Sequence, residues 1–182
     1  MNDNNSTVRA VLLAALMVLS VFAGTVAFTG TAAASSLNSG NSGISPDTVR
    51  EGTNNTHTVT LSISNLDTAN GNDAVAYVDL PDALNTGGSQ IQSVNVQQGN
   101  VTVGTPGTGA GTNNFSVPLQ DSGTGLASDT VVVTFDVTEV EAPSVGSDTT
   151  ADATLTVDDD TTDATGNDID DAVLQSLTIE SD

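Results

Sequence analysis

The sequence predicts an all-β protein: an antiparallel β-sandwich of seven to nine short strands that follows an N-terminal signal helix. Three observations support this class. Apolar and polar residues alternate with a period of two in most segments after residue 43, turn residues separate these segments, and none of them has convincing helical spacing. The one-sided alternation predicts antiparallel sheets with an outer face rich in Thr, Ser and Asp.

Eight segments carry the alternation and are predicted as strands: 56–64, 74–80, 91–96, 100–104, 113–119, 130–140, 151–157 and 173–180. A short strand around Ile44–Val49 would make nine. The segment 130–140 has the strongest pattern, and the residues predicted to face the core there are Val131, Val133, Phe135 and Val137. In 173–180 we expect Val173, Leu177 and Ile179 to face inward. Pro118 has no backbone N–H, which predicts an edge strand for 113–119.

The charge is high and almost entirely of one sign. The 182 residues contain 23 acids and two bases, and the formal net charge is −21. Disorder and life in concentrated salt both produce such a balance. The ordered alternation of apolar residues favours a folded halophilic domain, because molar salt screens its self-repulsion. The lack of basic patches argues against nucleic-acid binding, and the absence of cysteine excludes disulfides and thiolate chemistry.

The first 35 residues have the pattern of an export signal. Arg9 precedes an apolar run, Ala10 to Phe28, and the small residues Ala32-Ala33-Ala34 fit the rule for signal peptidase. The alternative is a retained membrane helix, since nineteen apolar residues could just span a bilayer. We expect cleavage between Ala34 and Ser35. The predicted layout is a signal peptide over 1–34, a flexible leader over 35–43 and a β-sandwich domain over 44–182.

The stretch "VRAVLLAALMVLSVFAGTVAFTGTAAAS" resembles the signal peptide of haloarchaeal surface (S-layer) glycoproteins. The resemblance implies an extracellular, high-salt setting. The segment 44–104, with "ISPDTVREGTNNTHTVTLSISNL" and "AVAYVDLPDAL", resembles the β-sandwich modules of haloarchaeal cell-surface proteins. Residues 125–157 are more loosely similar to the late strands of cohesin-like domains. The final residues, "SLTIESD", lack the C-terminal anchor pattern of such proteins, so we expect no membrane span after signal cleavage.

Three sequons for N-glycosylation lie in the predicted mature chain, at Asn54, Asn100 and Asn114. Chance is the alternative, because a chain rich in Asn, Ser and Thr forms sequons freely. Asn54 is the strongest candidate, since it is predicted in a polar loop before a strand. Asn100 and Asn114 are predicted at strand starts, where access is hindered.

The densest acidic run, Val157 to Asp171, reads "VDDDTTDATGNDIDD". It fails the EF-hand template in both registers, since Asp163 stands where glycine is needed in one and the first ligand is missing in the other. No metal site is therefore predicted. An irregular calcium site formed by Asp158, Asp160, Asp163 and Asp168 stays open as a minority alternative. The favoured interpretation is a solvated acidic loop between the last two strands.

No catalytic residue is predicted, and we expect a protein that is not an enzyme. His57 is the only histidine, and its parity with Val59 and Leu61 places it at the inner face in a structural role. Asp79 and Asp82 flank Leu-Pro and are expected to form a turn rather than an acid pair. The glycine-rich stretch 104–114 has no lysine for a phosphate loop and is expected to be a flexible turn.

Two hypotheses for function follow. The first is an exported, glycosylated, halophilic cell-surface structural protein that contributes to a surface layer, filament or matrix, with self-assembly or other cell-surface proteins as its partners. The alternative is a cohesin-like binding module for a protein or glycan, with calcium as a candidate stabilising ion. Tyr77 is the only tyrosine, and there is no tryptophan on which sugar rings could stack.

Overall fold

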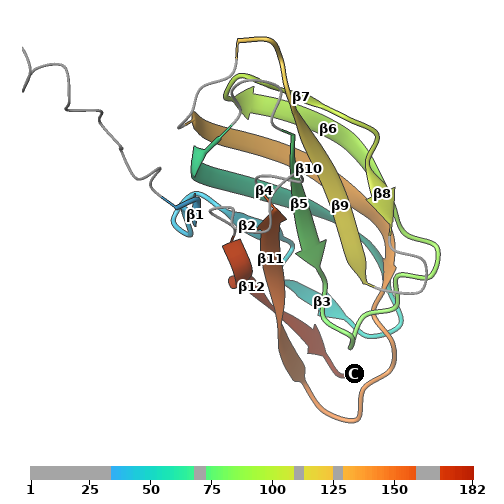
Figure 1. Cartoon of the computed structure of the whole chain (residues 1–182). Coiled ribbons are helices and arrows are strands. Elements are labelled where there is room, and N and C mark those ends of the chain that lie inside the picture. The colour runs from blue at the N-terminus through green and yellow to red at the C-terminus, as the bar shows by residue number, and fades with distance from the viewer. Residues whose placement is uncertain (1–33, 68–72, 109–112, 125–128, 159–168) are drawn as a thin grey trace, which may run out of the picture. The chain divides into compact units, whose positions relative to one another are not determined.

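The computed structural model of the chain describes residues 34–67, 73–108, 113–124, 129–158 and 169–182. The chain divides into two compact units, Met1–Thr31 and Ala32–Asp182, and the described residues all belong to the second unit. Those residues form strands and loops without a helix, which confirms the all-β prediction (Figure 1). The expected signal helix lies outside the described residues.

The first sheet has five strands, with β4 and β10 side by side at its centre. Its strands are β1 (Ser36–Leu37), β2 (Gly43–Ser45), β4 (Asn54–Leu66), β6 (Gln90–Gln98) and β10 (Asp129–Glu141). Strands β4 and β10 are antiparallel over almost their full length. Strand β6 pairs with the far side of β10, while β1 and β2 pair with the far side of β4.

The second sheet has seven strands, in the order β3-β12-β11-β5-β9-β7, with β8 also paired to β9. Its strands are β3 (Thr48–Arg50), β5 (Ala74–Asp79), β7 (Val101–Val103), β8 (Gly107–Thr108), β9 (Asn114–Asp121), β11 (Thr149–Asp158) and β12 (Ile169–Glu180). Strand β3 runs parallel to β12. This sheet is therefore mixed, whereas the sequence pattern predicts antiparallel sheets only.

One hydrophobic core lies between the two sheets, which confirms a β-sandwich. Alternate residues of the long strands are buried, and they include Val131, Val133, Phe135 and Val137 on β10 and Phe115, Val117 and Leu119 on β9. The core consists mainly of Val, Leu, Ile and Ala with two phenylalanines. The intervening Thr and Asp residues of β10 and β11, such as Thr134, Asp136 and Thr154, face away from it.

The segment 35–43, expected as a flexible leader, is part of the sandwich. Ser36 and Leu37 form β1 opposite Ser64 and Ile63, and Gly43 begins β2. Ser42 Oγ accepts a hydrogen bond from the backbone N–H of Ser62 at 2.8 Å. Strands of two or three residues are too short to show alternation, so the sequence pattern missed β1 and β8. The single short strand predicted around Ile44–Val49 is in fact two strands, β2 and β3, which belong to different sheets.

Pro118 is not in an edge strand, so that prediction is wrong. Strand β9 pairs with β5 on one side and with β7 and β8 on the other. The carbonyl of Pro118 accepts a hydrogen bond from Gly104 N at 3.0 Å, so its nitrogen also faces the interruption between β7 and β8. The missing N–H therefore removes no bond to β5.

Val173 points outward, which corrects its predicted inward orientation. Ala153 pairs with Gln175 but Thr154 pairs with Val173, so β12 has one extra residue at Leu174. This β-bulge reverses the alternation. Leu174 is buried, as are Leu177 and Ile179, while Val173 is 53% exposed.

Candidate functional site

The three predicted sequons differ in exposure. Asn54 is exposed and is the first residue of β4, opposite Glu141, rather than part of a preceding loop. Asn114 begins β9 and is half-buried beside Asp79. Asn100 lies between β6 and β7, is also half-buried, and its backbone N–H donates to Asp129 Oδ2 at 2.7 Å. Asn54 is therefore the most accessible of the three acceptors.

The predicted cleavage site lies at the boundary of the sandwich. Ala34 is the first described residue and is exposed. Ser35 is only 6% exposed, and its hydroxyl donates to the carbonyl of Asn65 at 3.2 Å. Since β1 begins at Ser36, cleavage after Ala34 would leave the first mature residue already inside the folded unit.

Most of the acidic run lies outside the described residues, including Asp160, Asp163 and Asp168 of the minority calcium alternative. Asp158 ends β11, and Asp171 lies in β12, where its carboxylate accepts a hydrogen bond from Thr156 Oγ1 at 3.3 Å. The described part of the chain contains no group of three or more His, Cys, Asp or Glu side chains arranged to hold a metal ion.

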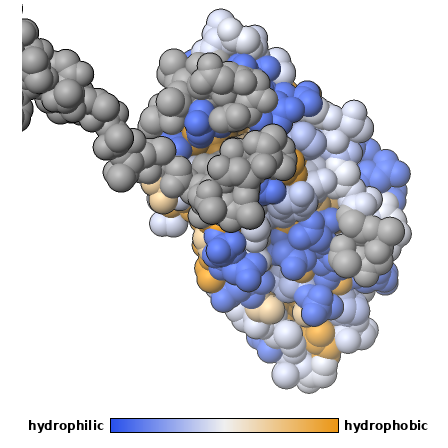
Figure 2. Space-filling view, viewed as in Figure 1, coloured by the Kyte–Doolittle hydropathy of each residue, from blue (hydrophilic) through white to orange (hydrophobic). Residues whose placement is uncertain are grey.

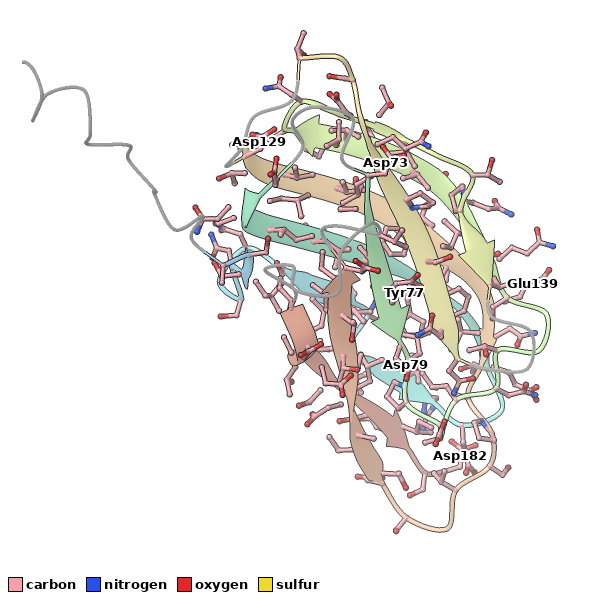
Figure 3. The ribbon with its side chains drawn as sticks, viewed as in Figure 1. Asp73, Tyr77, Asp79, Asp129, Glu139 and Asp182 are labelled. Carbon is pink, nitrogen blue, oxygen red and sulfur yellow. The ribbon has the colours of Figure 1, made fainter. Side chains whose placement is uncertain are left out.

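The described carboxylates are spread over the sandwich rather than gathered at one point. Figure 3 places Asp73 and Asp79 at opposite ends of β5, with Tyr77 between them, while Glu139 lies at the end of β10. Burial raises the pKa of Asp79, and the nearby charges of Asp82 and Asp171 raise it further. Desolvation is the main cause of the raised pKa and like-charge repulsion adds to it, so the shift needs no catalytic partner to explain it.

His57 is at the inner face, as predicted, and is 1% exposed. Its Nδ1 lies 2.9 Å from the carbonyl oxygen of Pro46, so the proton of the neutral ring is on Nδ1. Nε2 has no hydrogen-bond partner among the described residues, and His57 is one of the residues that line a cavity of about 10 Å³. Burial lowers the pKa of His57, and the bond to Pro46 only partly opposes this. The geometry fits a structural histidine.

The glycine-rich stretch contains more structure than the expected flexible turn. Gly107 and Thr108 form β8, and the Cβ of any other residue at 107 would lie 2.8 Å from Ser116 Oγ. Residues 109–112 lie outside the described part. Glycine at 107 is therefore explained by the close approach of β8 to β9.

The outer face of the five-stranded sheet is polar and carries few charges. Thr58 Oγ1 donates to Asp136 at 2.7 Å, and Gln97 Nε2 donates to Thr134 at 3.3 Å. An open groove of about 390 Å³ runs beside β2, lined mainly by Gly, Asn, Ser and Thr of residues 40–45, 58 and 60. Figure 2 shows the other side of the sandwich, where β5, β9 and β11 lie in front, and this side is mostly blue and pale, with hydrophobic residues in small separate patches. No large apolar surface is seen on that face.

One feature was missed from the sequence although its signal is visible there. No charged residue occurs between Asp82 and Asp121, in a chain with 23 acids. This stretch contains β6, β7, β8 and most of β9, which lie together in the structure. The distribution of charge along the chain, rather than the net charge, reveals this uncharged stretch.

Comparison with known proteins supports the predicted resemblance. No protein-family model matches the chain. A protein described as a cell surface glycoprotein from Haloferax gibbonsii is 49% identical over 78 residues, which cover 43% of this chain and 8% of that protein. The chain therefore matches less than a tenth of the length of that relative.

Solved structures with a similar arrangement of strands include pilins and cohesins. The major pilin subunit of Bacillus cereus is 11% identical with a TM-score of 0.45, covering 81% of this chain and 40% of the pilin. A non-cellulosomal cohesin from Archaeoglobus fulgidus is 12% identical with a TM-score of 0.37, covering 82% of this chain and 92% of the cohesin. These scores are too low to support a conclusion about function.

No helix among the described residues is long and apolar enough to cross a membrane. The sequence similarity and the two packed sheets are the findings that bear on identity. Over part of its length, this chain is similar to a haloarchaeal cell surface glycoprotein, and its second unit is a β-sandwich.

Proposed function

We propose that this chain is an exported structural protein of a haloarchaeal cell surface, without catalytic activity. The observation that carries the proposal is the 49% identity to a cell surface glycoprotein. The net charge of −21 agrees with an extracellular, salt-rich setting, where screening permits such a charge on a small domain. The relative is far longer than the matched region, so the role proposed here is that of one sandwich within a surface assembly.

The location is tested by producing the chain with its own N-terminal segment in a haloarchaeal host. Cells, medium and cytoplasm are separated in molar salt, and intact cells are treated with protease. We expect the protein on the cells, accessible to protease, with a mass that places the new N-terminus at Ser35. Retention in the cytoplasm, or release of all of it into the medium, would overturn the proposal. A stable monomer that captures one protein or glycan would favour the binding-module alternative.

Glycosylation is part of the proposal, with Asn54 as the principal acceptor because it is the exposed sequon. The test uses two substitutions of the exposed Thr56. Thr56→Val destroys the sequon, whereas Thr56→Ser keeps it. We expect intact mass spectrometry to show a glycan on wild-type and Thr56→Ser protein and its loss in Thr56→Val. The same glycan mass on all three proteins would place the modification at another residue. A wild-type protein without a glycan would refute glycosylation.

A further inference from the structure

Charge is distributed unevenly along this chain. No charged residue occurs from Ala83 to Gln120, while 16 of the 23 acids follow in Asp121 to Asp182. Acidic surfaces keep proteins of this composition apart, because like charges repel and carboxylates hold water. Within the sandwich this is the longest uncharged stretch, longer than the uncharged residues 34–46 that contain β1 and β2, so association through it meets little electrostatic resistance.

The fold brings this stretch to one side of the sandwich. Strand β6 is an outer strand of the five-stranded sheet, and β7 and β8 are outer strands of the seven-stranded sheet. Strand β6 also contacts β7 and β8 across the sandwich. The three strands lie together in Figure 1, and we call this surface, Gln90 to Thr108, the neutral flank.

The neutral flank is also where apolar side chains are left partly uncovered. Ile91, Val94 and Val96 on β6, and Val103 on β7, pack against the core but are only half-buried. The cause is the opposite sheet, because β7 has three residues and β8 two, too few to cover a nine-residue strand. Concentrated salt strengthens the burial of such apolar groups.

The backbone edge of β6 is not suited to continuous strand addition. Among the described residues, β6 pairs only with β10, but this pairing is interrupted twice. Ser93 has a φ of 55°, and the register shifts there and again beside Gln97. Bulges of this kind blunt an edge against further pairing. Contact at the flank is therefore made by side chains: the half-buried aliphatic row and the exposed amides of Gln92 and Asn95.

We propose that the neutral flank is the contact surface for a second copy of this chain, in a two-fold arrangement that packs flank against flank. A second copy fits because amide side chains both donate and accept hydrogen bonds, so the flank is complementary to itself. Three acids stand around the flank: Asp129 binds the backbone of Asn100 at one end, Glu139 lies beside Ser89 at the other, and Asp136 of β10 is the cross-strand partner of Gln92. Two-fold contact through the flank keeps most acids of the two copies apart.

The inference deepens the proposed structural role by naming a partner and a surface, and it is tested with isosteric changes. The flank variant carries Gln92→Glu and Asn95→Asp, which add two charges at exposed positions with little change in shape. The control variant carries Asn41→Asp and Gln175→Glu beside the groove at β2, which add the same charge away from the flank. Carboxylates buried in an interface are screened by salt much less than exposed ones, so the effect persists in molar salt.

Association is measured by sedimentation velocity in molar salt over a wide range of protein concentration, with protein purified in the form that haloarchaeal cells produce. We expect a dimer for wild type, a dissociation constant at least tenfold weaker for the flank variant and no change for the control. Far-UV circular dichroism confirms that each variant is folded. A wild type that stays monomeric, or equal weakening in both variants, would overturn the inference. Surface location with a monomer refutes only the flank, and a flank dimer absent from the surface refutes only the structural role.

Discussion

Strands β10 and β6 are neighbours in one sheet, yet they contribute differently to the sandwich. On β10 the inward residues Val131, Val133, Phe135 and Val137 are at most 1% exposed. On β6 the inward residues Ile91, Val94 and Val96 are half-buried. Strand β10 is paired on both sides, while β6, among the described residues, is paired on one.

The difference shows that alternation along a strand does not determine how fully its inner face is covered. Coverage depends on the opposite sheet, which meets β6 with the short strands β7 and β8. The sandwich is closed at its centre and partly open at the neutral flank. Stability is expected to come from the centre, and association from the flank.

Lowering the salt concentration is expected to have the largest effect, because it acts on the whole domain. At about 0.15 M salt the Debye length is about 8 Å rather than about 3 Å at 1 M, so the acids repel one another over longer distances. Apolar burial also weakens. We expect the cooperative thermal transition seen by circular dichroism in molar salt to be lost in dilute buffer.

Hydrogen exchange at intermediate salt sharpens the comparison between the strands. We expect the amides of β6 to exchange before those of β10, because local opening starts where burial is least. A domain that stays cooperatively folded in dilute buffer, or equal protection of both strands, would contradict this account. Adding calcium instead of sodium chloride separates a specific cation effect from general screening.

A matched pair of truncations has the next largest effect. Val133 on β10 and Val96 on β6 are cross-strand partners, but only Val133 is fully buried. We expect Val133→Ala to lower the free energy of unfolding by about 2 kcal/mol, through lost burial and the cavity left behind. Val96→Ala should cost about 1 kcal/mol or less, because the Val96 side chain is only half-buried and its truncation removes less apolar area from the core. Denaturant titration in molar salt at low protein concentration measures both, and equal losses would remove the distinction between centre and flank.

The long strands could be predicted because a period of two survives wherever a strand is regular. The inward residues of 130–140, 151–157 and 113–119 are buried as expected. The errors occur where the alternation of apolar and polar residues does not determine the orientation of a side chain or the partner of a strand. The bulge at Leu174 reversed the orientation of Val173, and the parallel pairing of β3 with β12 joins segments more than a hundred residues apart.

The candidate site was predicted less completely than the fold. Sequons are local motifs, so Asn54, Asn100 and Asn114 were found, but their exposure depends on neighbours such as Asp129 and Asp79. The uncharged stretch Ala83–Gln120 was visible in the sequence. Its meaning was not, because only the fold shows that β6, β7 and β8 from two sheets form one flank.

The pH dependence of stability tests the closed centre through His57, which lies opposite Val137 in the β4–β10 ladder. Burial lowers its pKa in the folded state from an ordinary value of 6.5. Its contribution is fully present above pH 6.5 and is lost as the pH falls from there toward the folded pKa, because only the unfolded chain then binds the proton. We expect the free energy of unfolding to fall over this window.

His57→Leu is the control for this effect. Histidine is the only side chain whose ordinary pKa lies between about pH 5 and 8, and the chain has one. The variant should therefore lose the slope just below pH 6.5 whatever its own stability. Urea titrations at several pH values measure the slope, and its persistence in His57→Leu would assign it to other groups.

The smallest expected effect is at Val173, where the same sheet has both an exposed and a buried apolar residue side by side. Because the bulge turns Val173 outward, Val173→Thr should change the free energy of unfolding by no more than about 0.5 kcal/mol. Leu174→Ala, one residue away, should cost about 2–5 kcal/mol, since Leu174 faces the core. Thermal denaturation in molar salt distinguishes the two. A large loss of unfolding free energy for Val173→Thr, with a small one for Leu174→Ala, would show that β12 keeps regular alternation. Leu174 would then face outward, and the neutral flank would not be the single place where apolar side chains of the described sandwich are uncovered.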